Sequence, residues 1–309
     1  MSELARNPVD LHTHTRASDG ADLPVELVAN AAAAGIEVLG LTDHDTVAGL
    51  ADTARAAERA GITFIPGVEI STSMPWANLD RPGARLPLHL LGYGFDPEDR
   101  ELRDTLAVYE RARVIRMGQM IERINMIWGW RTGKADAITP QRVLEIAGPM
   151  GVIGRPHLAR AMVEAGMADS IGDAFEKFLR HGREGYVRRA PVETEEMIRL
   201  IRRAGGAPIL AHPGEVLERG VALDQLLPVL KSWGLMGIET VYGEDDDYTR
   251  SRLAQAARDE GLIGTGGSDY HGLSVKPTRP LGLAPVSRQA VDDLLAAIAT
   301  ARATRDTFR

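Results

Sequence analysis

The first 95 residues alternate short apolar runs with longer runs of helical composition. The apolar runs have the length and the side chains of β-strands: residues 9–14, 36–44, 63–71 and 86–95. Between them, residues 24–35 and 46–61 are rich in alanine and end at Gly35 and Gly61, as helices commonly do. An order of strand, helix and strand predicts a parallel sheet covered by helices.

Residues 97–190 show helical periodicity, with no strand-like run before about residue 183. Residues 98–128 place apolar side chains three and four residues apart, which predicts one long helix. Three shorter helical runs follow, each closed by a glycine: residues 139–148, 155–166 and 170–182. This segment is therefore predicted to be a helical insertion in the α/β pattern.

Strand-like and helix-like runs alternate again from residue 194 onward. The predicted strands are residues 207–214, 235–242 and 262–271, and the predicted helices are residues 194–206 and a last helix from Val286. The chain then contains about seven βα units, interrupted between the fourth and the fifth. Its 309 residues leave room for one barrel with an insertion or for two domains.

Composition and charge narrow the classes of protein. Hydrophobic residues make up 44% of the chain and charged residues 26%, as in ordinary globular proteins, and no run approaches the ~20 apolar residues of a membrane span. The start, MSELARNPVD, lacks the apolar core of a secretory signal, and the absence of cysteine excludes disulfides and thiolate ligands, so a cytoplasmic protein is expected. The net charge of −7 argues against a stable complex with nucleic acid.

Imidazole and carboxylate side chains gather at the predicted ends of the strands. His12 and His14 stand two residues apart, so on a strand they would face the same way. Asp19 lies just beyond the same strand, and six further candidates lie at the ends of other strands: His44, Glu69, His89, His212, Asp269 and His271. Because strand ends meet at one face of such a fold, we expect these side chains to lie together. Nitrogen and oxygen ligands without sulfur favour Mn, Fe or Zn, and nine ligands suit two or three divalent ions.

Simpler roles exist for several of these residues. His89 or His212 taken alone would be typical of a hydrogen-bonded core histidine, and it is the whole set that favours a metal centre. Asp43 and Asp45 are expected either to orient imidazoles or to cap a helix, Asp45 being well placed as an N-cap. For two further histidines, His157 and His181 in the insertion, a structural role is favoured.

At the level of motifs the chain resembles a known superfamily. DLHTHT with a following SDG, then TDHDT, PGVE, AHPG and GSDYH, are similar to the successive motifs of the PHP (polymerase and histidinol phosphatase) metal-dependent phosphoesterases. GRPHLARAMVEAG, residues 154–166, and LAHPG resemble the branch of the nucleoside 3′,5′-bisphosphate phosphatases and 5′→3′ exoribonucleases. The resemblance implies an α/β fold, a distorted (β/α)7 TIM-like barrel, with residues 1–96 and 191–309 as the metal-binding barrel. Residues 97–190 would be the helical insertion, acting as a lid over the substrate.

The resemblance also implies a trinuclear site. The first metal would be held by His12, His14, Glu69 and Asp269, the second by Asp19, His44 and His271, and the third by the bridging Glu69 with His89 and His212. Three divalent ions facing three carboxylates leave a net positive site that favours a phosphate dianion. The hypothesis is that a metal-activated hydroxide attacks phosphorus in line, with His271 and His212 as candidate proton carriers.

A nucleotide substrate would need further cations, and the insertion supplies arginines, although exposed arginines are often only solvated. The candidates for phosphate contacts are Arg113, Arg116, Arg155 and Arg189. The main interpretation is hydrolysis of a phosphomonoester of a small nucleotide, such as a nucleoside 3′,5′-bisphosphate. The alternatives are a 5′→3′ exoribonuclease acting on short RNA and a non-catalytic metal-binding or regulatory barrel.

Overall fold

A computed structural model describes residues 8–77, 84–134, 136–148, 151–243 and 245–308. Residues 1–7, from which the absence of a secretory signal was partly inferred, lie outside the described residues. No helix in the described ranges is both long enough and apolar enough to cross a membrane. The cytoplasmic location stays a prediction.

Within the described residues, seven strands form one sheet in the order of the chain. They are β1 (Val9–Asp10), β2 (Val38–Leu41), β3 (Thr63–Pro75), β4 (Arg85–Tyr93), β5 (Ala207–Leu210), β6 (Gly237–Tyr242) and β7 (Ile263–Gly267). Just beyond the first and last strands, Thr13 pairs with Tyr270, and the backbone N–H of His14 donates to the Tyr270 carbonyl at 2.8 Å. These contacts bring the two edges together, so the sheet is a nearly closed barrel and the predicted fold class is confirmed.

The close approach of the two edges depends on a glycine. A Cβ added to Gly267, the last residue of β7, would lie 2.4 Å from the backbone nitrogen of His12. Since no side chain can occupy that space, glycine is required where β7 approaches the segment that follows β1. The same approach brings His12 and His14 next to the residues that follow β7.

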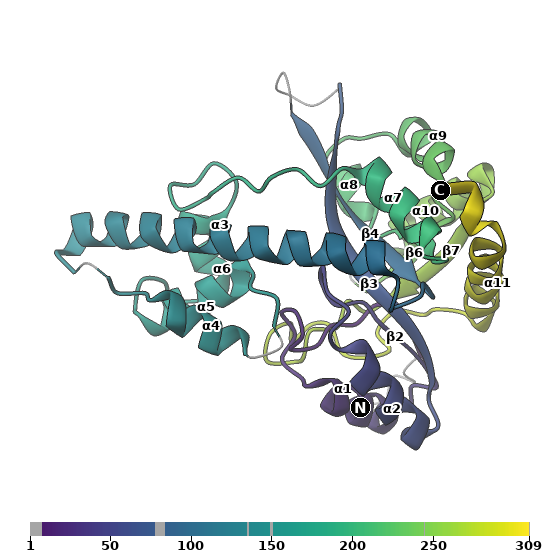
Figure 1. The fold of residues 1–309 in the computed structure, drawn as a ribbon, viewed down its shortest axis with the longest axis horizontal. Helices are drawn as coiled ribbons and strands as arrows, with labels where there is room; N and C mark the ends of the chain where they lie inside the picture. Colours follow the sequence, from purple (N-terminus) through teal and green to yellow (C-terminus); the bar gives the residue numbers. More distant parts are fainter. Residues whose placement is uncertain (1–7, 78–83, 135, 149–150, 244, 309) are drawn as a thin grey trace.

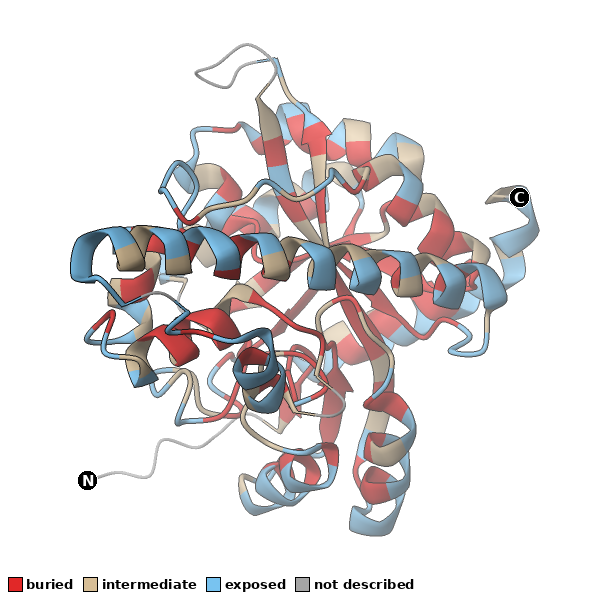
Figure 2. Cartoon of the chain, turned by 60° about the vertical axis from the view of Figure 1, so that its left-hand side comes forward, coloured by how far each residue is buried: buried red, intermediate tan, exposed pale blue. Residues whose placement is uncertain are grey.

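Helices surround the barrel, and the residues on their inner faces form its outer core (Figures 1 and 2). They are α1 (Pro24–Ala33), α2 (Leu50–Ala60), α7 (Thr194–Arg203), α8 (Gly214–Glu218), α9 (Leu223–Trp233), α10 (Asp247–Glu260) and α11 (Arg288–Thr304), followed by the 3-10 turn η2 (Arg305–Phe308). The ends follow local chemistry. α10 begins where the Asp246 carboxylate accepts the Thr249 N–H at 2.7 Å, and α2 ends at Gly61 with φ of 68°.

The expectation of an all-parallel sheet is wrong at one strand. β4 runs antiparallel to both β3 and β5, whereas the other neighbouring pairs are parallel. β3 and β4 form a long hairpin without the crossover helix that a parallel pair needs. Glu69 and His89 therefore lie within strands rather than at strand ends. Because His89 pairs with Ser71, which is two residues from Glu69, both side chains project from the same face.

The segment between β4 and β5 is helical. It contains α3 (Arg100–Thr132), α4 (Pro140–Ala147), α5 (Arg155–Glu164), α6 (Ile171–Ala174) and the π-helical η1 (Phe175–Leu179). The 33 residues of α3 extend from the barrel, and the shorter helices pack along it (Figure 1). They enclose an apolar cluster of their own, which includes Met120, Ile124, Leu158 and Met162. This cluster lies beside the barrel, so the helices that enclose it are near the ends of the strands.

Candidate metal centre

The side chain of Glu69 lies among imidazole rings at the mouth of the barrel. Glu69 is 1% exposed, and its Oε2 atom lies 3.1 Å from His14 Nε2. The same oxygen is 3.2 Å from His12 Nε2 and 3.2 Å from His44 Nδ1. His12 and His14 follow β1 and His44 follows β2, so this carboxylate joins three neighbouring strands of the sheet.

The second oxygen of Glu69 faces the antiparallel part of the barrel. Its Oε1 atom lies 2.6 Å from His89 Nδ1 and 3.0 Å from His212 Nε2. His89 projects from the middle of β4, and His212 follows β5 with φ of 30°. A positive φ is uncommon outside glycine, and such backbone strain is concentrated at functional sites. Glu69 thus touches five imidazoles, which arrive from four strands besides its own.

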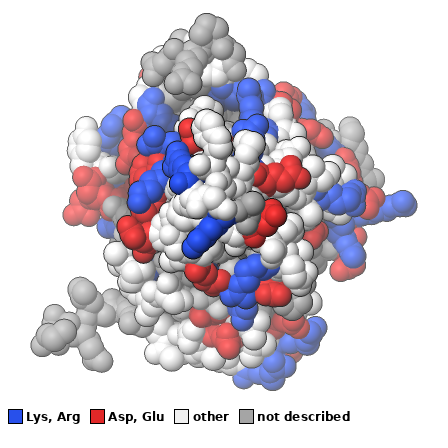
Figure 3. All heavy atoms as spheres, turned by 90° about the vertical axis from the view of Figure 1, so that its left-hand side faces the viewer, with Lys and Arg blue, Asp and Glu red and all other residues white. Residues whose placement is uncertain are grey.

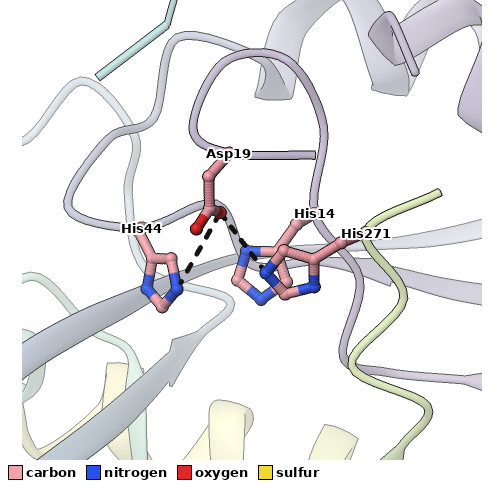
Figure 4. Close-up of side chains that lie close together, drawn as sticks. All are labelled: His14, Asp19, His44 and His271. Atoms are coloured by element: carbon pink, nitrogen blue, oxygen red, sulfur yellow. Dashed lines mark ion pairs between the residues drawn. The ribbon is translucent and has the colours of Figure 1, made fainter. Parts of the chain in front are cut away.

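Asp19 belongs to the loop that follows His14 and completes a second group of side chains. Its Oδ1 atom lies 3.3 Å from His271 Nε2 and 4.0 Å from His44 Nε2. Figure 4 shows the Asp19 carboxylate directed toward the rings of His44 and His271, with His14 beside them. The rings of His14 and His271 stack with their centroids 4.1 Å apart. Four potential ligands therefore converge from three loops.

Asp269 follows β7 and also has a positive φ, of 54°. Its Oδ1 atom faces the centre, 3.2 Å from His14 Nε2. Its Oδ2 atom accepts hydrogen bonds from Lys276 Nζ at 2.8 Å, from the Tyr242 hydroxyl at 2.9 Å and from Arg279. These donors fix the carboxylate so that one oxygen stays directed at the histidines.

All nine of the side chains predicted to be ligands are brought together here. In three groups the ligand atoms lie within 4.8 Å of one another: His12, His14, Glu69 and Asp269; His14, Asp19, His44 and His271; and His44, Glu69 and His89. The ninth candidate, His212, contacts Glu69. This grouping has the same core as the division implied by the resemblance, with His14 and His44 each reaching a second group.

The donor set suits divalent cations. His14 Nδ1, His44 Nδ1 and Asp19 Oδ1 are buried and have no aligned hydrogen-bond partner among the described residues. Buried polar atoms almost always have a partner, so these three are exceptions. A bound cation would be the missing partner. The Nε2 atoms of His12 and His14 also lie only 3.1 Å apart beside the same carboxylates. Two imidazole lone pairs and carboxylate oxygens that converge on one point are the ligands that Mn, Fe and Zn use.

Comparison with known proteins places this centre in a family. The model of the PHP domain matches residues 10–116. A 3′,5′-nucleoside bisphosphate phosphatase of Chromobacterium violaceum is 33% identical over 85% of this chain and 87% of its own length. A 5′-3′ exoribonuclease of Haemophilus influenzae is also 33% identical, over 85% of this chain and 89% of its own length. The chain belongs to the PHP family.

A solved structure agrees with this assignment. The structure of a metal-dependent phosphoesterase from Bifidobacterium adolescentis is 30% identical in sequence, with a TM-score of 0.81 over 94% of this chain and 96% of that one. The PHP protein described here is therefore a metal-dependent phosphoesterase, a hydrolase, and the resemblance noted in its sequence is confirmed. The alternative of a non-catalytic barrel is accordingly set aside.

Glu239 is a residue of the PHP centre that the sequence did not reveal. It lies on β6 and is 0% exposed. Its Oε1 atom accepts from His12 Nδ1 at 3.0 Å, and its Oε2 atom accepts the backbone N–H of His212 at 2.7 Å. A proton on His12 Nδ1 leaves the Nε2 lone pair free for a metal, so Glu239 selects the tautomer that coordination requires. The only signal in the sequence is a carboxylate within an apolar predicted strand.

Two further buried aspartates position the loops around the centre. Asp43 accepts from Thr15 Oγ1 at 2.6 Å and from Ser18 Oγ at 2.5 Å, which holds the loop that carries Asp19. Asp10 accepts from Ser268 Oγ at 2.6 Å, next to Asp269. Of the two roles expected for Asp43, neither is observed, because it orients a loop rather than an imidazole and caps no helix.

Asp45 does not cap the following helix, and that expectation is wrong. α2 begins at Leu50 with Gly49 as its N-cap. Asp45 instead accepts from Arg113 Nε at 2.8 Å and from Arg189 at 3.1 Å. Two of the arginines predicted to contact substrate therefore reach the edge of the centre through the residue that follows His44.

The other two predicted arginines, Arg116 and Arg155, bond to backbone carbonyls of the segment between β4 and β5. Arg116 Nε donates to the Val187 carbonyl at 2.7 Å, and Arg155 lies 3.4 Å from the Leu179 carbonyl. Burial and the nearby charge of Arg155 lower the pKa of Arg116 to about 10. His181 lies away from the centre, its ring 5.1 Å from that of Tyr186, in agreement with the structural role favoured for it.

The protonation states of the centre follow from burial and charge. Burial alone would raise the pKa of Glu69, Asp19 and Asp269, but interactions with the surrounding imidazoles lower each pKa well below its usual range. Burial lowers the pKa of His44 to about 3, so this ring is neutral, as a metal ligand must be. Burial also disfavours the charged form of His14, yet hydrogen bonds to Asp269 and Glu69 outweigh it and raise the pKa to about 9.

Metal binding is therefore expected to tighten as the pH rises from neutrality to about 9. Because the raised pKa keeps His14 protonated below that value, an incoming ion has to displace its proton, and affinity falls as the pH falls. Calorimetric titration with Mn²⁺ in buffers of different ionisation enthalpy should detect release of protons, to which His12 and His212, whose pKa values are also raised, contribute with His14. His14→Ala should reduce this release, and an affinity that stays constant from pH 7 to 9 would contradict the assignment.

Proposed function

We propose that this PHP phosphoesterase hydrolyses a phosphomonoester of a small nucleotide, with nucleoside 3′,5′-bisphosphates as the substrate class. The observation that carries the proposal is the set of carboxylates and imidazoles around Glu69, whose Oε atoms lie 2.6 to 3.2 Å from five histidine nitrogens. The phosphatase from Chromobacterium violaceum supports the choice of substrate, because the identity extends over 87% of its length.

The proposed ligands are the nine residues predicted from the sequence. One ion would be held by His12, His14, Glu69 and Asp269, a second by Asp19, His44 and His271, and a third by Glu69, His89 and His212. Two or three divalent ions, Mn, Fe or Zn, suit this set. When bound, they would supply an activated water and neutralise the charge on the phosphate oxygens.

The protein's own residues would bind and orient the substrate. The insertion, residues 97–190, is proposed to act as a lid over the barrel formed by 1–96 and 191–309. Arg113 and Arg189 would contact substrate phosphate at its edge, with Arg116 and Arg155 adding positive charge behind them. His271 and His212 remain the candidates to carry a proton to the leaving oxygen.

An exoribonuclease acting on short RNA is the second candidate. The relative from Haemophilus influenzae favours it, since it is as similar in sequence as the phosphatase. A long RNA would need an extended cationic groove. On the face formed by the tip of the insertion, however, Lys and Arg are interspersed with Asp and Glu (Figure 3). With the net charge of −7, this distribution supports the smaller substrate.

The test is phosphate release from adenosine 3′,5′-bisphosphate by Mn²⁺-loaded protein, with 5′-phosphorylated short RNA in parallel. Turnover of the bisphosphate is expected. Activity should be lost on chelation and in His12→Ala, because both remove the metal ion that is proposed to activate water. His181→Ala, which lies outside the centre, serves as the matched control. Stepwise shortening of RNA without release from the bisphosphate would select the second candidate, and turnover of neither would refute both.

A further inference from the structure

A cavity of about 260 Å³ lies where the barrel meets the insertion, directly beside the proposed metal centre. Arg16 and Asp19 line it from the loop that follows β1, and His157 and Arg160 line it from α5. In Figure 1, α4 and α5 lie next to the loops at this end of the barrel. Because Asp19 is a proposed metal ligand, anything bound in the cavity would be adjacent to the reacting group.

The cavity carries two arginines, Arg16 and Arg160, and one carboxylate, Asp19, whose Oδ1 atom lies 3.3 Å from His271 Nε2. Among the described residues, neither Arg16 nor Arg160 has a side-chain hydrogen bond or ion pair. This distinguishes them from Arg113 and Arg189, which are both bonded to Asp45. Two guanidinium groups that form no ion pair among the described residues, one on each wall of a cavity, are suited to an anion with several oxygens.

His157 adds a neutral donor to the same cavity. Its Nδ1 accepts the backbone N–H of Gly154 at 3.0 Å, so a neutral ring carries its proton on Nε2. Burial lowers the pKa of His157, which favours that neutral form. His157 lies in the first turn of α5, a ten-residue helix whose N-terminal dipole also favours negative charge. The structural role expected for His157 is therefore present, but the ring lines a cationic cavity as well.

A second cavity is lined mainly by acidic side chains. Its volume is about 430 Å³, and Glu215, Glu218 and Asp245 line it. It adjoins the centre through Glu215, which lies 3.5 Å from His212 Nδ1. Of the two arginines in its wall, Arg279 is bonded to Asp269. Like charges repel strongly in partly buried sites, so a second phosphate is disfavoured on this side.

We propose that Arg16, Arg160 and His157 form a subsite for the phosphate group of the substrate that is not under attack. The inference rests on the proposed hydrolysis of a phosphate ester at the adjoining centre. The ligand is an anionic phosphate group carried by the substrate itself, either the second phosphate of a nucleoside bisphosphate, a dianion, or the neighbouring diester phosphate of a short RNA, a monoanion. A phosphate bound by both Arg16 and Arg160 would connect the barrel to the insertion. Recognition of the second phosphate would therefore depend on the position of α5.

The test compares Arg16→Gln, Arg160→Gln and the double variant with Arg59→Gln, an exposed arginine on α2 that serves as the matched control. We expect each single change to lower kcat/KM for adenosine 3′,5′-bisphosphate by about 10- to 100-fold, mainly through KM, since each removes a charge-assisted hydrogen bond. Adenosine 3′- and 5′-monophosphates lack the second phosphate, and turnover of whichever is accepted should not change. Equal losses for the bisphosphate and the monophosphate, or no loss for either, would overturn the subsite.

A binding measurement separates this subsite from the proposed function. In a His12→Ala background, which should not turn over substrate, calorimetric titration with the bisphosphate should show weaker binding when Arg16 and Arg160 are replaced. If the wild-type protein releases no phosphate but the arginine variants still bind the bisphosphate less tightly, the proposed function fails and the subsite stands. Undiminished binding by the double variant refutes the subsite whatever the turnover. A parallel loss with 5′-phosphorylated RNA would assign the same subsite to a phosphate within a chain.

Discussion

Glu69→Gln is expected to lower phosphoester turnover by about 10³-fold and to reduce the number of metal ions bound. Glutamine keeps the size of the side chain but loses the negative charge that faces five imidazoles. Its amide nitrogen would also point a donor at histidine nitrogens that need to present lone pairs to a metal. The loss should exceed the about 100-fold that is typical when only an outer partner of a ligand is changed.

Elemental analysis of the purified variant and steady-state kinetics with saturating Mn²⁺ measure the two effects. Glu58→Gln on the exposed face of α2 is the matched control, and it should bind the same number of ions as the wild type. Circular dichroism distinguishes loss of ions from loss of fold. A folded Glu69→Gln protein that keeps its full metal content and its activity would show that Glu69 does not bridge the ions.

The members of this centre could be found from the sequence because the ends of successive strands meet at one face of the barrel. His12, His14, His44, His212 and Asp269 each follow a parallel strand, and a helix after a strand predicts where the strand ends. The direction of β4 was not predicted, because alternation and composition report a strand without its direction. The segment between the apolar runs 63–71 and 86–95 does indicate the direction of β4, because it contains no helix to connect two parallel strands.

Partners that arise from tertiary packing could not be predicted from local pattern. The spacing before α2 favours Asp45 as a cap, but Arg113 and Arg189 arrive from the insertion and engage it instead. In the same way, Arg16 and Arg160 are ordinary surface arginines in the sequence, and only the fold shows that they face one cavity without partners. The sequence identifies the chemistry of the centre, whereas its supporting contacts depend on which distant segments meet.

Glu239→Gln is expected to weaken Mn²⁺ binding by about 10- to 100-fold, with turnover falling by a similar factor at limiting metal. Among the described residues, His12 is the only proposed ligand whose side chain contacts Glu239. An amide can accept one of the two hydrogen bonds now made by the carboxylate, but its NH₂ group would then face the second donor. His12 would lose its fixed tautomer, and the metal would lose a ligand held in place before binding.

The dependence on metal concentration separates this positioning role from that of a ligand. Since Glu239→Gln leaves every proposed ligand in the chain, excess Mn²⁺ should restore most of its turnover, whereas the loss in Glu69→Gln should persist at any Mn²⁺ concentration. The apparent Kd for Mn²⁺, taken from activity and from calorimetry, measures the shift directly. Turnover that stays low in saturating Mn²⁺, with an unchanged Kd, would mean that Glu239 acts on the substrate and not through His12.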